Sequence, residues 1–204
     1  YCMPAEGLPW LPGAQMLTTA ELLRIVRLAV DCGVDSVRLT GGEPLLRPDL
    51  IEVVAGIAAM GVEVSMTTNG LRLPSLAAPL RDAGLRRVNI SLETLDRETF
   101  RQLTHRDRLV DTLAGIHAAQ VAGLEPVKIN AVLLRGVNDQ QAPELLRWAI
   151  GQGVRLRFIE QMPLDPQHGW RREEMVTADE ILALLTSAGF RLTPIDDPGP
   201  APAR

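Results

Sequence analysis

Strand-like segments alternate with helical segments along the chain, and this alternation restricts the fold more than any other feature. Apolar residues at helical spacing predict a first helix capped by Thr18 or Thr19, further helices at 48–61, 76–83, 143–150 and 176–187, and one long helix that ends near Ala122. Strands are predicted at 36–40, 62–67, 87–92, 126–133 and 154–160. Because strands separated by helices pair in parallel, the sequence predicts an α/β fold, either an open doubly wound sheet or a (β/α) barrel.

Within most of the predicted strands, apolar side chains alternate with polar ones. A parallel sheet covered on both faces has nearly continuous apolar strands, and the inside of a closed barrel is filled by branched side chains. Here one face carries hydroxyl, amide and cationic groups: Arg38, Thr40, Ser65, Thr67, Asn89, Ser91, Lys128 and Asn130. This pattern favours a partial (β/α) TIM-type barrel with outer helices, whose inner face binds a large, polar, anionic ligand. The alternative is that some of these strands are edge strands with their polar face in solvent.

Polar groups also follow three of the predicted strands directly. The first strand runs into Thr40-Gly41-Gly42-Glu43-Pro44, the second into Thr67-Thr68-Asn69-Gly70, and the third ends in Asn89-Ile90-Ser91-Leu92-Glu93. Two consecutive glycines let a ligand approach the backbone closely, and a carboxylate beside bare carbonyls suits an ammonium group. Since sites in barrels lie at the carboxyl ends of strands, these segments predict a binding site there.

Size and charge narrow the class of protein. The 204 residues suit one hydrophobic core, and a net charge of −4 argues against broad nucleic-acid binding. No apolar run reaches the roughly 18–20 residues that span a bilayer, so no membrane partner is expected and the cytoplasm is the expected location. Cys32 is expected to be a buried packing thiol, and the histidines His105, His117 and His168 have no metal-ligand spacing.

Several motifs occur in a fixed order: Tyr1-Cys2-Met3-Pro4, Arg38-Leu39-Thr40-Gly41-Gly42-Glu43-Pro44-Leu45, Thr67-Thr68-Asn69-Gly70, Asn89-Ile90-Ser91-Leu92, Gly136-Val137-Asn138-Asp139, Arg157-Phe158-Ile159-Glu160-Gln161-Met162 and Gly169-Trp170. Together they resemble the GTP 3′,8-cyclase family of radical S-adenosylmethionine (SAM) enzymes, which act in molybdenum cofactor biosynthesis. The resemblance covers essentially the whole chain. It implies a radical SAM core barrel over residues 1–193 and a Pro-rich linker over 194–204.

The resemblance also implies roles for individual residues. Cys2 matches the third thiolate of a CxxxCxxC loop that binds a [4Fe–4S] cluster. The positions that match SAM contacts are Tyr1, Gly42, Glu43, Ser91 and Met162, and those that match GTP contacts are Arg38, Thr67 and Lys128. No side chain is assigned as a catalytic residue. Glu93 departs from the family pattern, which more often has Asp at this position.

The implied reaction is a lyase step that cyclises GTP to (8S)-3′,8-cyclo-7,8-dihydroguanosine 5′-triphosphate. The implied cofactors are SAM and two [4Fe–4S] clusters, and the implied partners are GTP, an electron donor, a downstream cyclic pyranopterin monophosphate synthase and a second copy in a homodimer. Because two cluster cysteines and a C-terminal three-cysteine site would lie outside these 204 residues, we expect the chain alone to hold no stable cluster and to be inactive. The alternatives are a radical SAM enzyme that acts on a peptide or another nucleotide, and a non-catalytic nucleotide-binding remnant.

Overall fold

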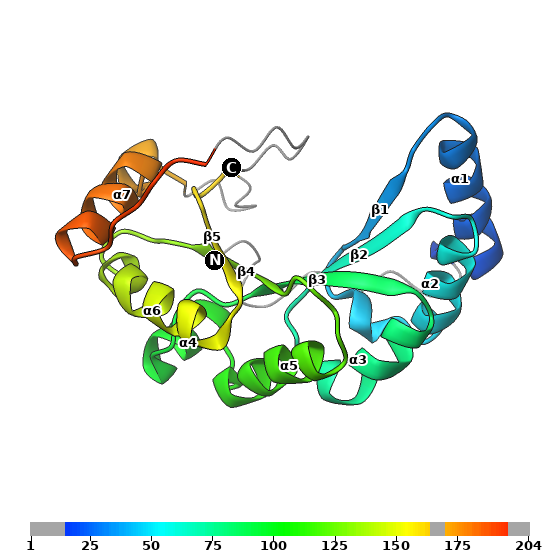
Figure 1. Ribbon diagram of the computed structural model, residues 1–204, viewed down its shortest axis with the longest axis horizontal. Coiled ribbons are helices and arrows are strands. Elements are labelled where there is room, and N and C mark those ends of the chain that lie inside the picture. The colour runs from blue at the N-terminus through cyan, green and yellow to red at the C-terminus, as the bar shows by residue number, and fades with distance from the viewer. Residues whose placement is uncertain (1–14, 164–169, 196–204) are drawn as a thin grey trace.

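Five parallel strands form one sheet in the order β1-β2-β3-β4-β5 in the computed structural model, which describes residues 15–163 and 170–195 (Figure 1). The strands are β1 (Ser36–Leu39), β2 (Glu63–Thr68), β3 (Leu85–Ser91), β4 (Lys128–Val132) and β5 (Arg155–Ile159). The helices are α1 (Thr19–Asp31), α2 (Leu50–Ala58), α3 (Leu73–Asp82), α4 (Arg97–Thr104), α5 (Leu109–Val121), α6 (Ala142–Gln152) and α7 (Ala178–Ser187). The predicted α/β fold with a parallel sheet is confirmed.

The sheet curves into an arc, and its convex side is covered by helices. Figure 1 shows α2, α3, α5 and α6 along that side, with α1 and β1 at one end of the arc and α7 at the other. The concave side carries no helix among the described residues, and we call it the open face. This is the partial barrel with outer helices that the sequence predicts.

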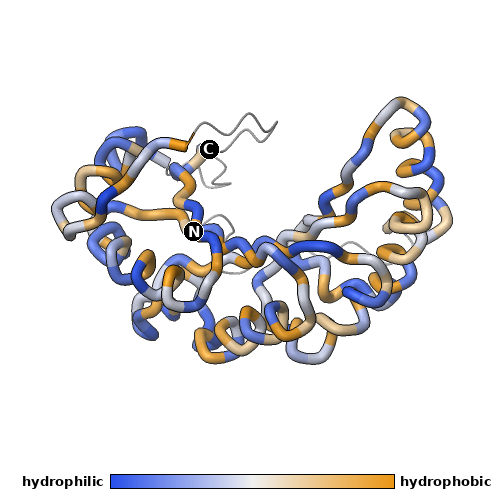
Figure 2. Tube along the Cα trace, viewed as in Figure 1, coloured by the Kyte–Doolittle hydropathy of each residue, from blue (hydrophilic) through white to orange (hydrophobic). Residues whose placement is uncertain are grey.

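The hydrophobic core lies between the sheet and its helices. Every second strand side chain points into it, and Figure 2 shows the resulting alternation of apolar and polar residues along the strands. The fully buried strand residues include Val64, Met66, Val88, Ile90 and Ile129, which pack in one cluster with residues of α2, α3, α5 and α6. A smaller cluster beneath α7 contains Leu133, Ala142, Val176, Ile181 and Leu185. Because the core uses only one face of each strand, the other face is free to carry polar groups.

Hydroxyl caps fix the beginnings of the first and last helices. Thr18 caps α1 and Thr177 caps α7, and each forms a reciprocal capping box with a glutamate three residues later. Of the two candidates for the first cap, the structure selects Thr18.

The expected single long helix that ends near Ala122 is wrong, because α4 and α5 are separate helices. His105 ends α4 in a left-handed conformation with φ of 55°, which an α-helix cannot continue through. The turn is held by Arg97, whose guanidinium donates two hydrogen bonds to the Asp107 carboxylate at 2.8 and 2.6 Å. The hydroxyl of Thr104 donates to the Phe100 carbonyl oxygen at 2.7 Å and takes part in the same turn.

The expectation of a buried Cys32 is also wrong. Cys32 is exposed at the C-terminal cap of α1, a helix whose own residues are at most partly buried. It follows α1, which Figure 1 shows at one end of the arc.

No helix in residues 15–163 and 170–195 is both long enough and apolar enough to cross a bilayer. Of the expected Pro-rich linker, residues 196–204 lie outside the described residues, as does His168.

Candidate functional site

Three rows of polar side chains cross the open face. Because the strands are parallel and in register, residues on neighbouring strands lie side by side. The row nearest the carboxyl ends is Ser91, Asn130 and Arg157. The next contains Thr67, Asn89, Lys128 and Arg155, and the deepest contains Arg38, Ser65 and Arg87. The residues that match GTP contacts therefore lie in the two deeper rows, whereas Ser91, which matches a SAM contact, lies in the outer row.

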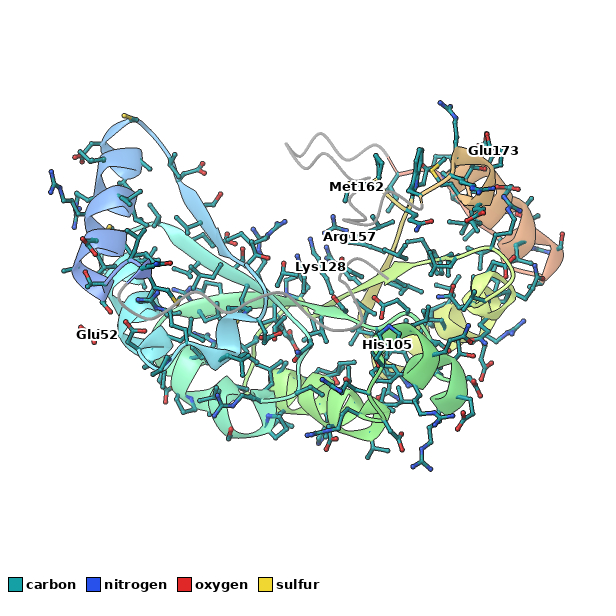
Figure 3. All side chains as sticks on the ribbon, turned by 180° about the vertical axis from the view of Figure 1, so that it is seen from behind. Glu52, His105, Lys128, Arg157, Met162 and Glu173 are labelled. Atoms are coloured by element: carbon teal, nitrogen blue, oxygen red, sulfur yellow. The ribbon has the colours of Figure 1, made fainter. Side chains whose placement is uncertain are left out.

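The open face concentrates positive charge. Burial lowers the pKa of Lys128 below its ordinary value, and the neighbouring cations lower it further: Arg157, Arg87, Arg155 and Arg38. Figure 3 shows Lys128 and Arg157 on this face between the two ends of the arc, whereas Glu52 and His105 lie on the helix side. Of these cations, Arg87 forms an ion pair with Glu63 at 2.5 Å. A face with this excess of cations in a chain of net charge −4 is suited to bind an anion with several charges.

The outer row also contains an unsatisfied acceptor. The Oδ1 atom of Asn130 is shielded from solvent and accepts no hydrogen bond from any described residue. An unpaired buried acceptor costs about 1–3 kcal/mol, so such atoms are uncommon unless something else supplies a donor.

The carboxylate of Glu43 joins the ends of β1 and β2. One oxygen, Oε1, accepts hydrogen bonds from the Thr68 hydroxyl at 2.6 Å and from the Leu45 backbone N–H at 3.0 Å. The other, Oε2, accepts from the Asn69 backbone N–H at 2.7 Å. A carboxylate has about four lone-pair sites, so three protein donors occupy most of its capacity. Its observed contacts hold the two strand ends together and leave room for only one further donor.

The backbone beside Glu43 is open. Gly41 has a φ of 141°, which side chains rarely adopt, and a Cβ atom added at Gly41 or Gly42 would meet no atom within 4 Å. A pocket of about 640 Å³, lined mainly by apolar residues, includes both glycines. A ligand can therefore approach this main chain closely.

A fully buried amide braces the same edge of the sheet between β3 and β4. The Asn138 side chain donates hydrogen bonds to the Glu93 and Val132 carbonyl oxygens, both at 3.0 Å, and accepts one from the Leu134 N–H at 2.7 Å. These three bonds fix the spacing of the strand ends that carry Ser91 and Asn130.

The structure brings most of the predicted site residues to one side of the sheet. Arg38, Thr67, Lys128 and Ser91 share the open face, and Figure 3 places Met162, which is 57% exposed, on that side beyond the end of β5. Gly42 and Glu43 follow β1. Tyr1 and Cys2 lie outside the described residues, and the described part of the chain contains no group of three or more His, Cys, Asp or Glu side chains that could bind a metal.

The predicted polar face included Asn130 but did not include Arg155 and Arg157 of β5. The signal was present, since Arg155 and Arg157 alternate with Leu156 and Phe158 along β5 as polar residues do along the other strands.

Curated relatives match nearly the whole chain. A protein of Paenarthrobacter nicotinovorans named GTP 3′,8-cyclase is 54% identical over 197 residues, which cover 95% of this chain and 55% of the relative. A protein of the same name from Streptomyces coelicolor is 52% identical over 208 residues, which cover 100% of this chain and 61% of the relative. The chain thus spans little more than half the length of these relatives.

Solved structures share the fold at low sequence identity. Methylornithine synthase superimposes with a TM-score of 0.61 and 20% identity, covering 83% of this chain and 53% of that one. A domain of pyruvate-formate lyase-activating enzyme from Bacteroides vulgatus superimposes with a TM-score of 0.58 and 17% identity, covering 77% of this chain and 96% of that one. The sequence profile of the radical SAM superfamily matches residues 1–149. With its curved parallel sheet and its Gly41-Gly42-Glu43 strand end, the chain belongs to the radical SAM superfamily.

Proposed function

We propose that the chain is the core of a radical SAM lyase that cyclises GTP to (8S)-3′,8-cyclo-7,8-dihydroguanosine 5′-triphosphate, the first step of molybdenum cofactor biosynthesis. The observation that carries the proposal is the open face itself, where five cations share one side of a parallel sheet with hydroxyl and amide groups. The identity of 52–54% to proteins named GTP 3′,8-cyclase supports GTP as the anion.

In this proposal the deeper rows bind GTP. Arg38 and Lys128 bind the triphosphate, and the Thr67 hydroxyl, in the same row as Lys128, donates a further hydrogen bond. On β5, Arg155 lies beside Lys128 and Arg157 lies beside Asn130. The two arginines therefore extend the cationic surface beyond the predicted contacts. A bound anion would relieve the repulsion among these cations, which gives the charged ligand an advantage over a neutral one.

The outer row and the strand ends bind SAM. The open backbone at Gly42 receives its amino-acid part, while Ser91 and Met162 contact the remainder. Tyr1 and Cys2 are proposed to contribute beside the cluster. Glu43 keeps Gly42 and the β2 end in place through its bonds to Thr68 and Asn69, and its remaining lone pair is available to the SAM ammonium.

The cofactors, when bound, supply a one-electron cleavage of SAM and the radical chemistry that begins the cyclisation. The contribution of this chain is orientation. The cationic rows fix the triphosphate, and the outer row fixes the nucleoside of SAM next to it. Asn138 holds the strand ends that carry these rows at a constant spacing. No described side chain is assigned a proton transfer.

The proposed function implies four further features. They are an electron donor, a downstream cyclic pyranopterin monophosphate synthase that takes the product, a homodimeric assembly, and a cytoplasmic location. We also propose that residues 1–193 form the radical SAM core and that 194–204 link it to a second cluster domain.

The test uses the full-length protein with its clusters reconstituted without oxygen. Incubation with GTP, SAM and dithionite is expected to give the cyclised nucleotide, detected by liquid chromatography and mass spectrometry. Lys128→Met is expected to raise KM for GTP by at least tenfold, whereas Arg24→Met, which removes an exposed cation from α1, leaves KM unchanged. The absence of cyclised product with the wild-type protein would overturn the proposal.

A further inference from the structure

The side-chain oxygen of Asn130, in the outer row of the open face, has no contact of its own in the proposed function. Asn130 is only partly buried as a residue, yet its Oδ1 atom is shielded from water and meets no donor within residues 15–163 and 170–195. Asn130 lies between Ser91 and Arg157 in the outer row and two residues after Lys128 on β4. It therefore stands where the proposed SAM row meets the proposed GTP rows.

The chemistry of the neighbours defines what Asn130 can bind. Lys128 and Arg157 are pure hydrogen-bond donors, so they suit phosphate or carboxylate oxygens. A side-chain amide oxygen is an acceptor, and a phosphate has no proton to donate to it at neutral pH. The matching group on a ligand is a hydroxyl or an N–H, which a nucleoside carries on its sugar and its base.

The unpaired acceptor can be turned toward such a group. The last torsion of an asparagine side chain has a broad energy profile, so the amide can rotate Oδ1 onto the open face without a change of backbone. A ligand that supplies a donor then satisfies an acceptor that is unpaired in the free protein. Ligand binding is favoured for that reason, in addition to the new contact itself.

We propose that Asn130 is a further ligand-binding residue, whose Oδ1 atom accepts a hydrogen bond from a hydroxyl or N–H of a bound nucleoside. The inference rests on the proposed function, because that function supplies two nucleosides, the adenosyl group of SAM and the guanosine of GTP. Both present the required donor, and the experiment distinguishes between them.

The experiment measures ligand affinity and stability in the full-length protein with reconstituted clusters. The affinities for SAM alone and for GTP alone are measured by isothermal titration calorimetry for the wild type and for Asn130→Leu, which has a similar size and no acceptor. The affinity for one of the two ligands is expected to fall at least tenfold, and that ligand is the donor. Two rescue variants restore an oxygen acceptor: Asn130→Asp for the SAM titration and the uncharged Asn130→Ser for the GTP titration. Each is expected to recover at least half of the loss in the logarithm of the affinity.

Stability separates a ligand contact from a structural one. If Oδ1 is unpaired in the free protein, Asn130→Leu leaves the urea midpoint unchanged or raises it. A lowered midpoint with both affinities intact would show that Oδ1 has a partner within the protein and would overturn the inference. Unchanged affinities for both ligands would also overturn it while the proposed function stands. A wild-type protein that binds neither SAM nor GTP would overturn both.

Discussion

At the scale of single residues, Glu43 is a test of how much of the site depends on one carboxylate. Its two oxygens accept three hydrogen bonds, one of which comes from the Asn69 backbone N–H. In Glu43→Gln one oxygen becomes an NH₂ group, which cannot accept, so a donor at the strand ends loses its partner. We expect a loss of about 1–3 kcal/mol in the free energy of unfolding, measured with urea.

The matched control for this change is Glu52→Gln, which removes a carboxylate from the exposed side of α2. Its effect is expected to stay within about 0.5 kcal/mol. Equal losses in the two variants would show that the Glu43 hydrogen bonds do not contribute to stability.

Lys128 gives a prediction for the pH dependence of stability. Burial and the nearby arginines lower the pKa of this lysine in the folded chain, so the folded state releases the proton at a lower pH than the unfolded state. Between those two pKa values the unfolded state binds more protons, and the free energy of unfolding therefore rises with pH.

In Lys128→Met this rise is expected to be missing. Both proteins are titrated with urea at a series of pH values from neutral to the ordinary lysine pKa. The quantity compared is the difference between their free energies of unfolding at each pH. A difference that is constant over this range would show that the Lys128 ammonium is not destabilised in the folded chain.

A single residue could be predicted from the sequence when its role depends on its neighbours in the chain. It could not when its role depends on residues that are distant in the sequence. The alternation of Arg38, Thr67 and Lys128 with apolar neighbours is a local pattern, and it correctly predicted which side chains share a face. The hydrogen bonds of Glu43 join residues 25 and 26 positions apart, so nothing near Glu43 in the sequence indicates them. Likewise, only the folded sheet shows that Asn130 lacks a donor.

At the scale of elements, helix α5 approaches the loop after β2 closely where two glycines meet. A Cβ atom at Gly115 of α5 would lie 2.1 Å from the backbone oxygen of Gly70, in the loop after β2. Backbone on both sides has little freedom to move apart. We therefore expect Gly115→Ala to lower the free energy of unfolding by about 1–3 kcal/mol, measured by urea titration.

Gly151 is the control, because it is a glycine in helix α6 with no atom within 4 Å of an added Cβ. There alanine is expected to stabilise the chain by about 0.4–1 kcal/mol, since it restricts the unfolded state. The expectation fails if both substitutions change stability in the same direction.

Most of the α-helices and strands could be predicted from the sequence, and the missed break within one predicted helix has a physical cause. Apolar periodicity predicted the five strands and most of the helices within a few residues. It did not predict the break between α4 and α5, because His105 is not a residue that stops a helix by its own preference. The Arg97–Asp107 contact accompanies the break and joins residues ten positions apart, so local preference does not indicate it.

At the scale of the whole molecule, charge is distributed unevenly. The chain has a net charge of −4, while Arg38, Arg87, Lys128, Arg155 and Arg157 gather on one face. Salt screens the attraction between this cluster of cations and an anion. The Kd of the full-length protein for GTP is therefore expected to rise about tenfold from 50 to 500 mM salt. Guanosine, which has no phosphate, is expected to change by less than about twofold under the same conditions. Equal salt dependence of the two ligands, measured by calorimetry, would contradict an electrostatic role for this face.

The one-sided packing of the sheet has a consequence for how such a molecule can change over time. Strand residues that point toward the helices determine whether the chain folds, and those that point to the open face determine what it can hold, so mutations in the two sets are largely independent. A lineage can therefore exchange its polar lining step by step while the scaffold keeps its stability.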